Sequence, residues 1–285
     1  MNNLLRLVGP VMVAIGAFAF DGCSVFDPAE EIPSYVRINS IDLQINNSTI
    51  EGTASHKITD AWVYVDGDLI GGFEMPVSVP ILAEGTHTIL ILAGIKQNGL
   101  SSTRAIYPYY KGWQSTITLT RGQVVTVNPV VEYYPATTFM WMCNFDGPGT
   151  NIDDNLGPYP GRMTEDTVGG FEGEYGYVTL NADTTDFYAQ SSSSYTFNGA
   201  YDIYLEMNYK CNQDFVIGIY NTTNGNYVPW CDVQASTNWN KIYIRLNDAV
   251  TTQPPNGIYH VYVAMKKNDD TANPWLAIDN LKLIN

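Results

Sequence analysis

Short stretches of alternating apolar and polar residues, separated by turn dipeptides, constrain this fold more than any other feature. Residues 35–45, YVRINSIDLQI, alternate as a half-buried strand does. Asp66-Gly67 and Asn98-Gly99 stand between further apolar stretches, and such pairs are typical of tight hairpin turns. Residues 35–134 have no convincing helical periodicity, and strand signals continue to residue 285. The pattern predicts an all-β protein.

The strand signals fall into two groups, which predicts two domains. Residues 35–134 hold roughly seven short strands, as an immunoglobulin-like or transthyretin-like β-sandwich does. Residues 135–142, PATTFMWM, are interpreted as a linker. Residues 143–285 contain roughly seven or eight strand-like segments, which suggests a β-jelly roll. The predicted architecture is therefore a β-sandwich followed by a jelly roll.

Two regions of the chain resemble known families. Residues 239–244 (WNKIYI), 259–263 (YHVYV) and 275–280 (WLAIDN) resemble the closing strands of galactose-binding-like jelly rolls, a fold used by many carbohydrate-binding modules. Residues 93–113, AGIKQNGLSSTRAIYPYYKGW, resemble uncharacterised Bacteroidota lipoproteins, from which no function carries across. The first resemblance implies a fold more than a function, because one such fold hosts many activities.

The first 22 residues predict a targeting signal. Arg6 precedes a short apolar run, as in a secretory signal peptide. Gly22-Cys23 resembles a bacterial lipobox, which would make Cys23 the lipidated first residue of the mature chain. The pattern Ala17-Phe18-Ala19 offers a rival cleavage site before Phe20. The hypothesis for the N-terminus is therefore a lipid anchor, with a secreted form as its alternative.

The next segment is interpreted as the tether of that anchor. Residues 23–34 are polar, acidic and proline-bearing, as a flexible linker is. Asp27, Glu30 and Glu31 resemble the acidic surface-export signal of Bacteroidota lipoproteins. We therefore expect the protein to be held by its N-terminal lipid at the outer membrane, on the cell surface.

Charge and motifs exclude several functions. The net charge of −15 opposes binding to nucleic acid, whose phosphates must be neutralised by basic residues. His56, His87 and His260 lack zinc-ligand spacing, and no H-E-x-x-H or G-x-S-x-G motif occurs. The sequence therefore predicts no enzyme. A glycoside hydrolase, which brings two carboxylates together from distant strands, is the least favoured function.

Residues 144–155, NFDGPGTNIDDN, suggest a structural calcium ion. Calcium needs about six to eight oxygen ligands, and the Asp and Asn side chains of this loop offer many such oxygens. The jelly-roll resemblance implies a calcium ion that joins the first strand to the last. The predicted ligands are Asp146, Asp153, Asp154 and Asp279, with Asp146 and Asp279 first. A loop whose Asn and Asp side chains only form its own turns is the alternative.

Aromatic residues near turns suggest two contact surfaces. Sugars bind flat aromatic faces beside polar groups, which favours a ligand site at Tyr227, Trp230 and Asp232. The stretch YPYYKGW suggests a surface for a protein partner or a glycan, or else a loop folded over its own core. Its candidate contact residues are Tyr107, Tyr109, Tyr110 and Trp113.

Two functions remain open from the sequence. The first is a non-catalytic lipoprotein that acts as an interaction or assembly module with outer-membrane or envelope proteins. The alternative is a glycan-binding lipoprotein of a polysaccharide-uptake system. The lipid anchor, the YPYYKGW loop and the absence of catalytic motifs support the first, and the jelly-roll resemblance and the region around Trp230 support the second.

The lipid anchor is directly testable. Mass spectrometry of the mature N-terminus should find a chain that begins at an acylated Cys23. Cys23→Ala should release the protein from the membrane fraction, because no lipid can then be attached. A chain that begins at Phe20 and keeps an unmodified Cys23 would instead establish a secreted protein.

Overall fold

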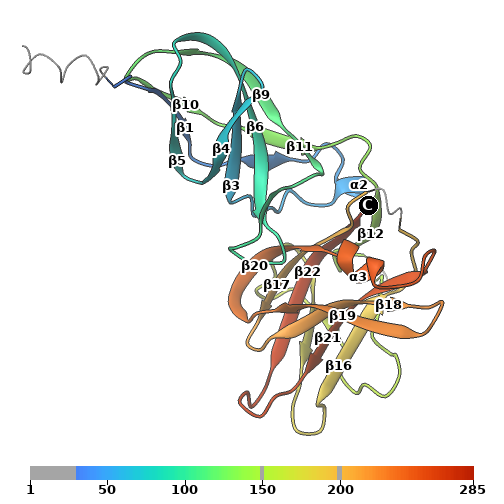
Figure 1. Ribbon diagram of the computed structural model, residues 1–285. Coiled ribbons are helices and arrows are strands. Elements are labelled where there is room, and N and C mark those ends of the chain that lie inside the picture. Colours follow the sequence, from blue (N-terminus) through green and yellow to red (C-terminus); the bar gives the residue numbers. More distant parts are fainter. Residues whose placement is uncertain (1–29, 148–150, 198–200) are drawn as a thin grey trace, which may run out of the picture.

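The computed structural model describes residues 30–147, 151–197 and 201–285, which form two β-sandwiches joined end to end (Figure 1). The described elements are strands apart from two short helices, α2 (Ser48–Glu51) and α3 (Asn247–Thr251). Neither is long or apolar enough to cross a membrane, and no other described helix exists to do so. The predicted all-β class, a sandwich followed by a jelly roll, is confirmed. Cys23 and the signal peptide lie outside the described residues.

The N-terminal sandwich is built from eleven strands in three small sheets. Their orders are β10-β1-β5, β2-β11-β8 and β4-β3-β6-β7, with β9 also paired to β6. The long strand β6 carries its inward apolar residues on alternate positions, as the sequence pattern predicts. The bounds are β1 Ser34–Ile38, β2 Asp42–Gln44, β3 Asp60–Val65, β4 Asp68–Glu74, β5 Val77–Ile81, β6 Gly85–Lys96, β7 Arg104–Ile106, β8 Tyr110–Lys111, β9 Trp113–Leu119, β10 Val124–Val127 and β11 Val130–Tyr133.

The two predicted turns are confirmed. Asp66 and Gly67 join β3 to β4 with φ values of 51° and 97°. Asn98 and Gly99, with φ values of 54° and 73°, make a turn at the start of the longer segment 97–103 that joins β6 to β7. Paired positive φ angles match the right-handed twist of hairpin strands, and Asn, Asp and Gly adopt them most readily. These dipeptides therefore fix where the chain reverses.

The C-terminal sandwich packs a six-stranded sheet against a five-stranded one. The six-stranded sheet runs β14-β15-β22-β17-β20, with β12 also paired to β22, and the five-stranded sheet runs β13-β16-β21-β18-β19. Strand β12 already belongs to this sandwich, so it starts inside the segment 135–142 that the sequence suggested as a linker. The bounds are β12 Phe139–Cys143, β13 Ile152–Asp153, β14 Thr164–Asp166, β15 Tyr175–Thr179, β16 Asp186–Ser191, β17 Tyr204–Cys211, β18 Phe215–Asn221, β19 Asn226–Val233, β20 Ser236–Arg245, β21 Tyr259–Lys266 and β22 Trp275–Ile284.

The described cysteines belong to the core of this second sandwich. Cys143, Cys211 and Cys231 are free and buried. Cys231 lies opposite Ile217, because a bulge between Ile217 and Gly218 shifts the hairpin register. The interpretation of these three residues as small apolar core side chains is confirmed. Burial raises the pKa of the Cys231 thiol to about 11, which keeps it protonated and unreactive.

Tyrosines from both domains fill the junction between the two sandwiches. Tyr107 is fully buried, and its ring centroid lies 4.5 Å from that of Tyr110 in its own domain. Across the junction, the ring centroid of Tyr107 lies 5.1 Å from that of Tyr204 and 4.9 Å from that of Tyr243. Edge-to-face contacts of this kind add to the stabilisation that burial alone provides. The N-terminal core therefore continues without a break into the C-terminal domain.

A buried ion pair lies beneath these rings. The Nζ of Lys241 is 2.9 Å from Oε2 of Glu206, and both side chains are almost wholly buried. Oε1 of Glu206 accepts hydrogen bonds from the hydroxyls of Tyr107 at 2.7 Å and Tyr133 at 2.9 Å. Burial works to raise the pKa of Glu206, but Lys241 and Lys282 outweigh it and the pKa is lowered. The carboxylate therefore stays ionised and holds both domains.

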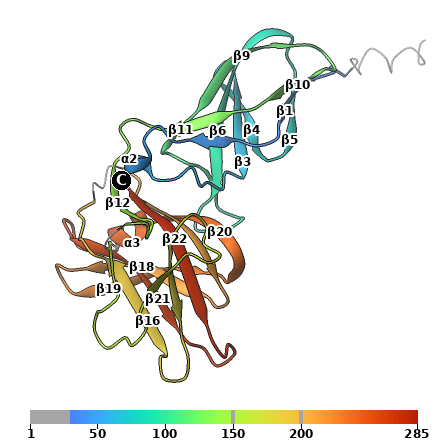
Figure 2. The same ribbon diagram turned by 180° about the vertical axis from the view of Figure 1, so that it is seen from behind.

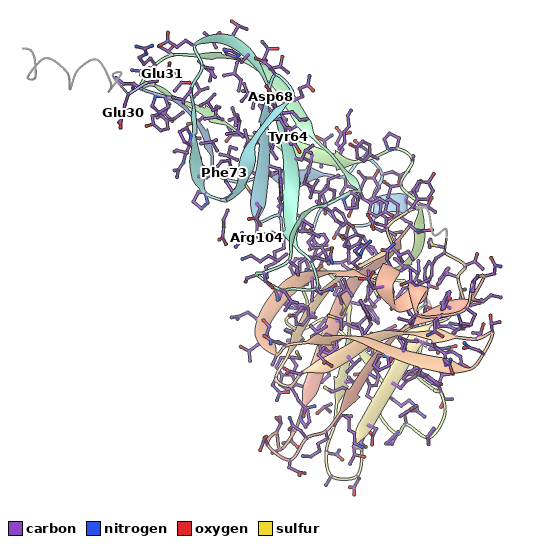
Figure 3. All side chains as sticks on the ribbon, viewed as in Figure 1. Glu30, Glu31, Tyr64, Asp68, Phe73 and Arg104 are labelled. Carbon is purple, nitrogen blue, oxygen red and sulfur yellow. The ribbon has the colours of Figure 1, made fainter. Side chains whose placement is uncertain are left out.

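Backbone contacts reinforce the junction. The amide of Asn98 donates to the carbonyl of Tyr243 at 2.8 Å, and the amide of Arg245 donates to Oδ1 of Asn98 at 2.9 Å. The Nζ of Lys282 donates to the carbonyl of Thr53 at 2.7 Å. The described chain starts at the opposite end of the N-terminal sandwich, where Figure 3 labels Glu30. The rear view in Figure 2 shows the same end-to-end arrangement.

The ion pair should dominate the stability of the junction. Lys241→Met leaves the Glu206 carboxylate buried without its cation, which is expected to cost about 3–5 kcal/mol of unfolding free energy. Urea denaturation followed by tyrosine fluorescence measures this cost. Lys266→Met is the matched control, because the Lys266 side chain is 80% exposed and its nearest acid, Asp186, is 4.0 Å away. Equal midpoints for the two variants would contradict this assignment.

Candidate functional site

The outer face of the five-stranded sheet is the most distinctive surface of the C-terminal domain. Inward residues such as Phe187, Ile217 and Val263 belong to the core, so the alternate positions of the same strands face outward. Those positions carry aromatic side chains on neighbouring strands. They are Tyr188 on β16, Tyr262 on β21, Tyr220 on β18 and Tyr227 on β19, and Tyr159 from the preceding loop joins them. We call these five residues the tyrosine face.

Consecutive ring contacts link the tyrosine face. The ring of Tyr159 stacks on Tyr188 with centroids 5.2 Å apart, and Tyr188 meets Tyr227 edge-on at 5.6 Å. Tyr227 in turn stacks on Tyr220 at 4.5 Å. His260 extends the series, since its ring stacks on Tyr220 at 6.3 Å. The rings thus form a continuous run across several strands.

Small residues in the sheet make room for these rings. A Cβ atom built on Gly218 would lie 2.4 Å from Cζ of Tyr262, so this ring lies directly over the glycine. Gly218 pairs with Tyr262 across β18 and β21, and Ala264 pairs with Tyr188 across β21 and β16. Because neither partner has a long side chain, the rings can lie along the sheet instead of standing up from it.

The tyrosine face combines buried and exposed rings. Tyr188 and Tyr262 are 3% and 5% exposed, whereas Tyr227 is 52% exposed, and Tyr159 and Tyr220 are intermediate. Burial, with smaller contributions from Tyr159 and Tyr227, raises the pKa of Tyr262 to about 12. Its hydroxyl is therefore neutral at physiological pH. The buried rings support the exposed ones from below.

Polar groups flank the rings. Oε1 of Gln190 accepts a hydrogen bond from the hydroxyl of Tyr188 at 2.9 Å. Nδ1 of His260 lies 2.6 Å from the carbonyl oxygen of Ser191, which fixes the imidazole ring. Asp232 is exposed on β19 and pairs with the outward-facing Val216. The face therefore offers flat apolar surfaces with hydrogen-bonding groups beside them.

The structure separates the three candidate ligand residues of this region. Tyr227 lies within the run of rings, and Asp232 lies on the same side of the sheet. Trp230 does not: its side chain packs against the core, and its indole N–H donates to the carbonyl of Arg245 at 2.7 Å. Alternation along β19 from the outward-facing Tyr227 places Trp230, like Val228, on the core side, so its position beside the turn does not make it exposed.

Tyr159, Tyr188, Tyr220 and Tyr262 were not predicted as site residues from the sequence. A signal was present, since DFYAQS, FVIGIY and YHVYVA each place a tyrosine out of phase with the core residues. Recognition also requires knowing that β16, β21 and β18 are neighbours, although β16 and β21 are far apart in sequence.

The candidate partner-contact residues of the N-terminal domain lie inside the chain. Tyr107, Tyr109 and Tyr110 are buried at the junction of the two sandwiches, and Trp113 packs against the N-terminal core. The tyrosine hydroxyls meet groups of the C-terminal domain, as when Tyr109 donates to the carbonyl of Asp202. These tyrosines are thus not an open surface, because the second domain of the same chain covers them.

The candidate calcium ligands divide into two sets. Asp146 and Asp279 come together around the loop of Glu172 and Glu174: the amide of Glu174 donates to Asp146 at 2.8 Å, and the amide of Glu172 donates to Asp279 at 3.2 Å. Burial, together with the charges of Asp146 and Glu172, raises the pKa of Asp279 to about 7. Crowded acidic groups of this kind favour a cation.

Asp153 and Asp154 have other surroundings. Asp153 is exposed on β13, and Oδ2 of Asp154 accepts the amide of Met163 at 2.6 Å. Across the residues that the structure describes, no three or more His, Cys, Asp or Glu side chains are grouped so as to hold a metal ion. Calcium binding thus stays a prediction. Of the four predicted ligands, only Asp146 and Asp279 lie close enough together to support it.

The chain is similar to solved structures, but the other comparisons found no match. No protein-family model and no curated protein matches the chain. A variant of the family 29 carbohydrate-binding module CBM29-2 is 13% identical, with a TM-score of 0.36, over 52% of this chain and 91% of that one. The family 11 carbohydrate-binding module of the cellulosomal cellulase Lic26A-Cel5E of Clostridium thermocellum is 16% identical, with a TM-score of 0.35, over 52% and 94%.

A calcium titration tests the acidic pair. Calcium at millimolar concentration should raise the melting temperature of the wild-type chain by a few degrees, because the ion would bind only the folded state. Asp279→Asn and Asp146→Asn should each abolish this shift, whereas Asp153→Asn should retain it. Identical melting curves of the wild type in calcium and in chelator would remove the ion from this site.

Proposed function

We propose that the C-terminal sandwich binds a neutral polysaccharide chain along the tyrosine face, without catalysis. The observation that carries this proposal is the continuous run of rings from Tyr159 through Tyr227 to His260. Sugar rings present apolar C–H faces that pack on aromatic rings, and their hydroxyls need hydrogen-bonding groups nearby. A run that crosses several strands suits several consecutive sugars better than a single one.

The charge of the protein favours a neutral glycan. The chain carries a net charge of −15, and Asp232 lies on the tyrosine face itself. Lys266 on this side of the sheet lies near Asp186, at 4.0 Å between Nζ and Oδ1, and Arg162 beside Tyr159 donates to the carbonyl of Tyr159 at 2.6 Å. Acidic polysaccharides would therefore be repelled, while a neutral chain pays no such cost.

The glycan hypothesis gains support over an assembly role with envelope proteins. The tyrosines that suggested a protein-binding loop, Tyr107, Tyr109 and Tyr110, are covered by the C-terminal domain. The tyrosine face instead combines half-exposed rings with neutral hydroxyls and an amide, which matches a hydroxylated ligand. We extend the proposal to a surface lipoprotein that delivers glycans to an uptake system, anchored through Cys23.

The position of the chain's first described residues is compatible with that anchor. They lie at the end of the N-terminal sandwich that is farthest from the C-terminal sandwich (Figures 1 and 3). A tether leaving from this end would place the N-terminal domain next to the membrane. The tyrosine face would then stand away from the lipid surface, where a polysaccharide can reach it.

Substitution of the exposed ring tests the site. Tyr227→Ala should weaken binding of a neutral hexasaccharide at least about tenfold, since truncation of an aromatic hot spot costs about 2 kcal/mol or more. Tyr227→Phe should keep most of the affinity, because the stacking ring remains. Isothermal titration over a panel of neutral oligosaccharides measures both.

A matched control separates stacking from general loss of surface. Phe171→Ala removes a ring that is 37% exposed and packs edge-on with Trp239, outside the tyrosine face. It should leave glycan affinity unchanged. If no neutral oligosaccharide binds the wild type, or if Tyr227→Ala binds as tightly as Phe171→Ala, the proposed function is wrong.

A further inference from the structure

A pocket of about 400 Å³ lies at the junction of the two sandwiches. Tyr109 and Tyr134 of the N-terminal domain line one side, and Tyr201 of the C-terminal domain lines another. The connecting segment between the domains contributes Ala136 and Thr137. This volume is within the range of small-molecule sites, about 300–1,000 Å³. The pocket shares no residue with the tyrosine face.

The walls of this pocket are held in place by the domain junction. The hydroxyl of Tyr109 donates to the carbonyl of Asp202, next to Tyr201, which links the two sides. The amide of Tyr134 donates to the carbonyl of Tyr109 at 2.9 Å, and the amide of Thr137 donates to the carbonyl of Tyr134 at 2.9 Å. The site therefore needs no large rearrangement to accept a ligand.

The lining indicates the chemistry of the ligand. Tyr134 and Tyr201 are 45% and 60% exposed, so two large rings face solvent at the pocket. Among its described lining residues there is no Asp, Glu, Lys or Arg, which favours a neutral ligand.

We propose that this pocket is a second glycan site, which accepts one or two terminal sugar units of a neutral carbohydrate. The exposed rings of Tyr134 and Tyr201 would pack on the apolar faces of the sugar. The exposed hydroxyls of Tyr134 and Tyr201 would bind its hydroxyl groups. The inference goes beyond the proposed function of the tyrosine face and does not depend on it, because the two sites are built from different residues.

The test uses neutral disaccharides as the probe for the pocket and neutral hexasaccharides as the probe for the tyrosine face. Isothermal titration is performed on the full chain, on the double variant Tyr134→Ala/Tyr201→Ala and on Ala136→Trp. Both variants change exposed positions, so folding should be retained. The double variant removes the stacking rings, and Ala136→Trp fills the pocket while both rings stay.

We expect both pocket variants to weaken disaccharide binding at least about tenfold. Tyr134→Phe/Tyr201→Phe, which keeps the rings, should lose less than the alanine pair. Phe171→Ala, which lies outside both proposed sites, should leave disaccharide binding unchanged. Melting temperatures close to that of the wild type confirm that each variant is folded.

Two results would overturn the second site. One is disaccharide affinity in the pocket variants equal to that of the wild type, or no disaccharide binding at all. The other is complete loss of both probes in Tyr227→Ala, which would leave the tyrosine face as the sole site. If the pocket variants lose binding while Tyr227→Ala keeps hexasaccharide affinity, the pocket proposal stands and the function proposed for the tyrosine face fails.

Discussion

The ion pair between Glu206 and Lys241 is the interaction on which the arrangement of this molecule depends. A buried carboxylate must be compensated, and here two tyrosine hydroxyls from the N-terminal domain and a lysine from the C-terminal domain do so together. Separation of the domains would strip Glu206 of the hydroxyls of Tyr107 and Tyr133. The two sandwiches are thereby fixed relative to each other, and the pocket between them acquires a defined shape.

Local features of the fold could be predicted from the sequence because they depend on local physics. Alternation of apolar residues gave the strands, and Asp66-Gly67 and Asn98-Gly99 gave two turns, since positive φ angles favour these residues. The start of the second domain was misplaced, because residues 139–143 pair with the last strand of the chain. A pairing between strands that lie at opposite ends of this domain's sequence leaves no local signal in either segment.

In the candidate sites, too, residues near a local signal could be predicted, whereas residues brought together by the strand order could not. Tyr227 was found because it stands beside a recognisable turn, whereas Tyr188 and Tyr262 become neighbours through the order of strands β16 and β21. Trp230 was chosen because it stands beside the same turn, but alternation from Tyr227 places it on the core side of β19. The tyrosines of YPYYKGW were predicted either to contact a partner or to fold over the core of the chain, but the sequence alone could not reveal that they contact Glu206, Tyr204 and Tyr243 of the second domain.

The rigid junction also bears on how two glycan sites would act together. A flexible linker would let the sites move independently, so that a bound polysaccharide gains little fixed geometry. With Asn98 and Tyr107 bonded to the C-terminal domain, the distance between the pocket and the tyrosine face is instead constant. A constant separation raises the effective concentration of the second site only for glycans long enough to reach it. Chain length, in addition to sugar chemistry, would then determine which polysaccharides the protein retains.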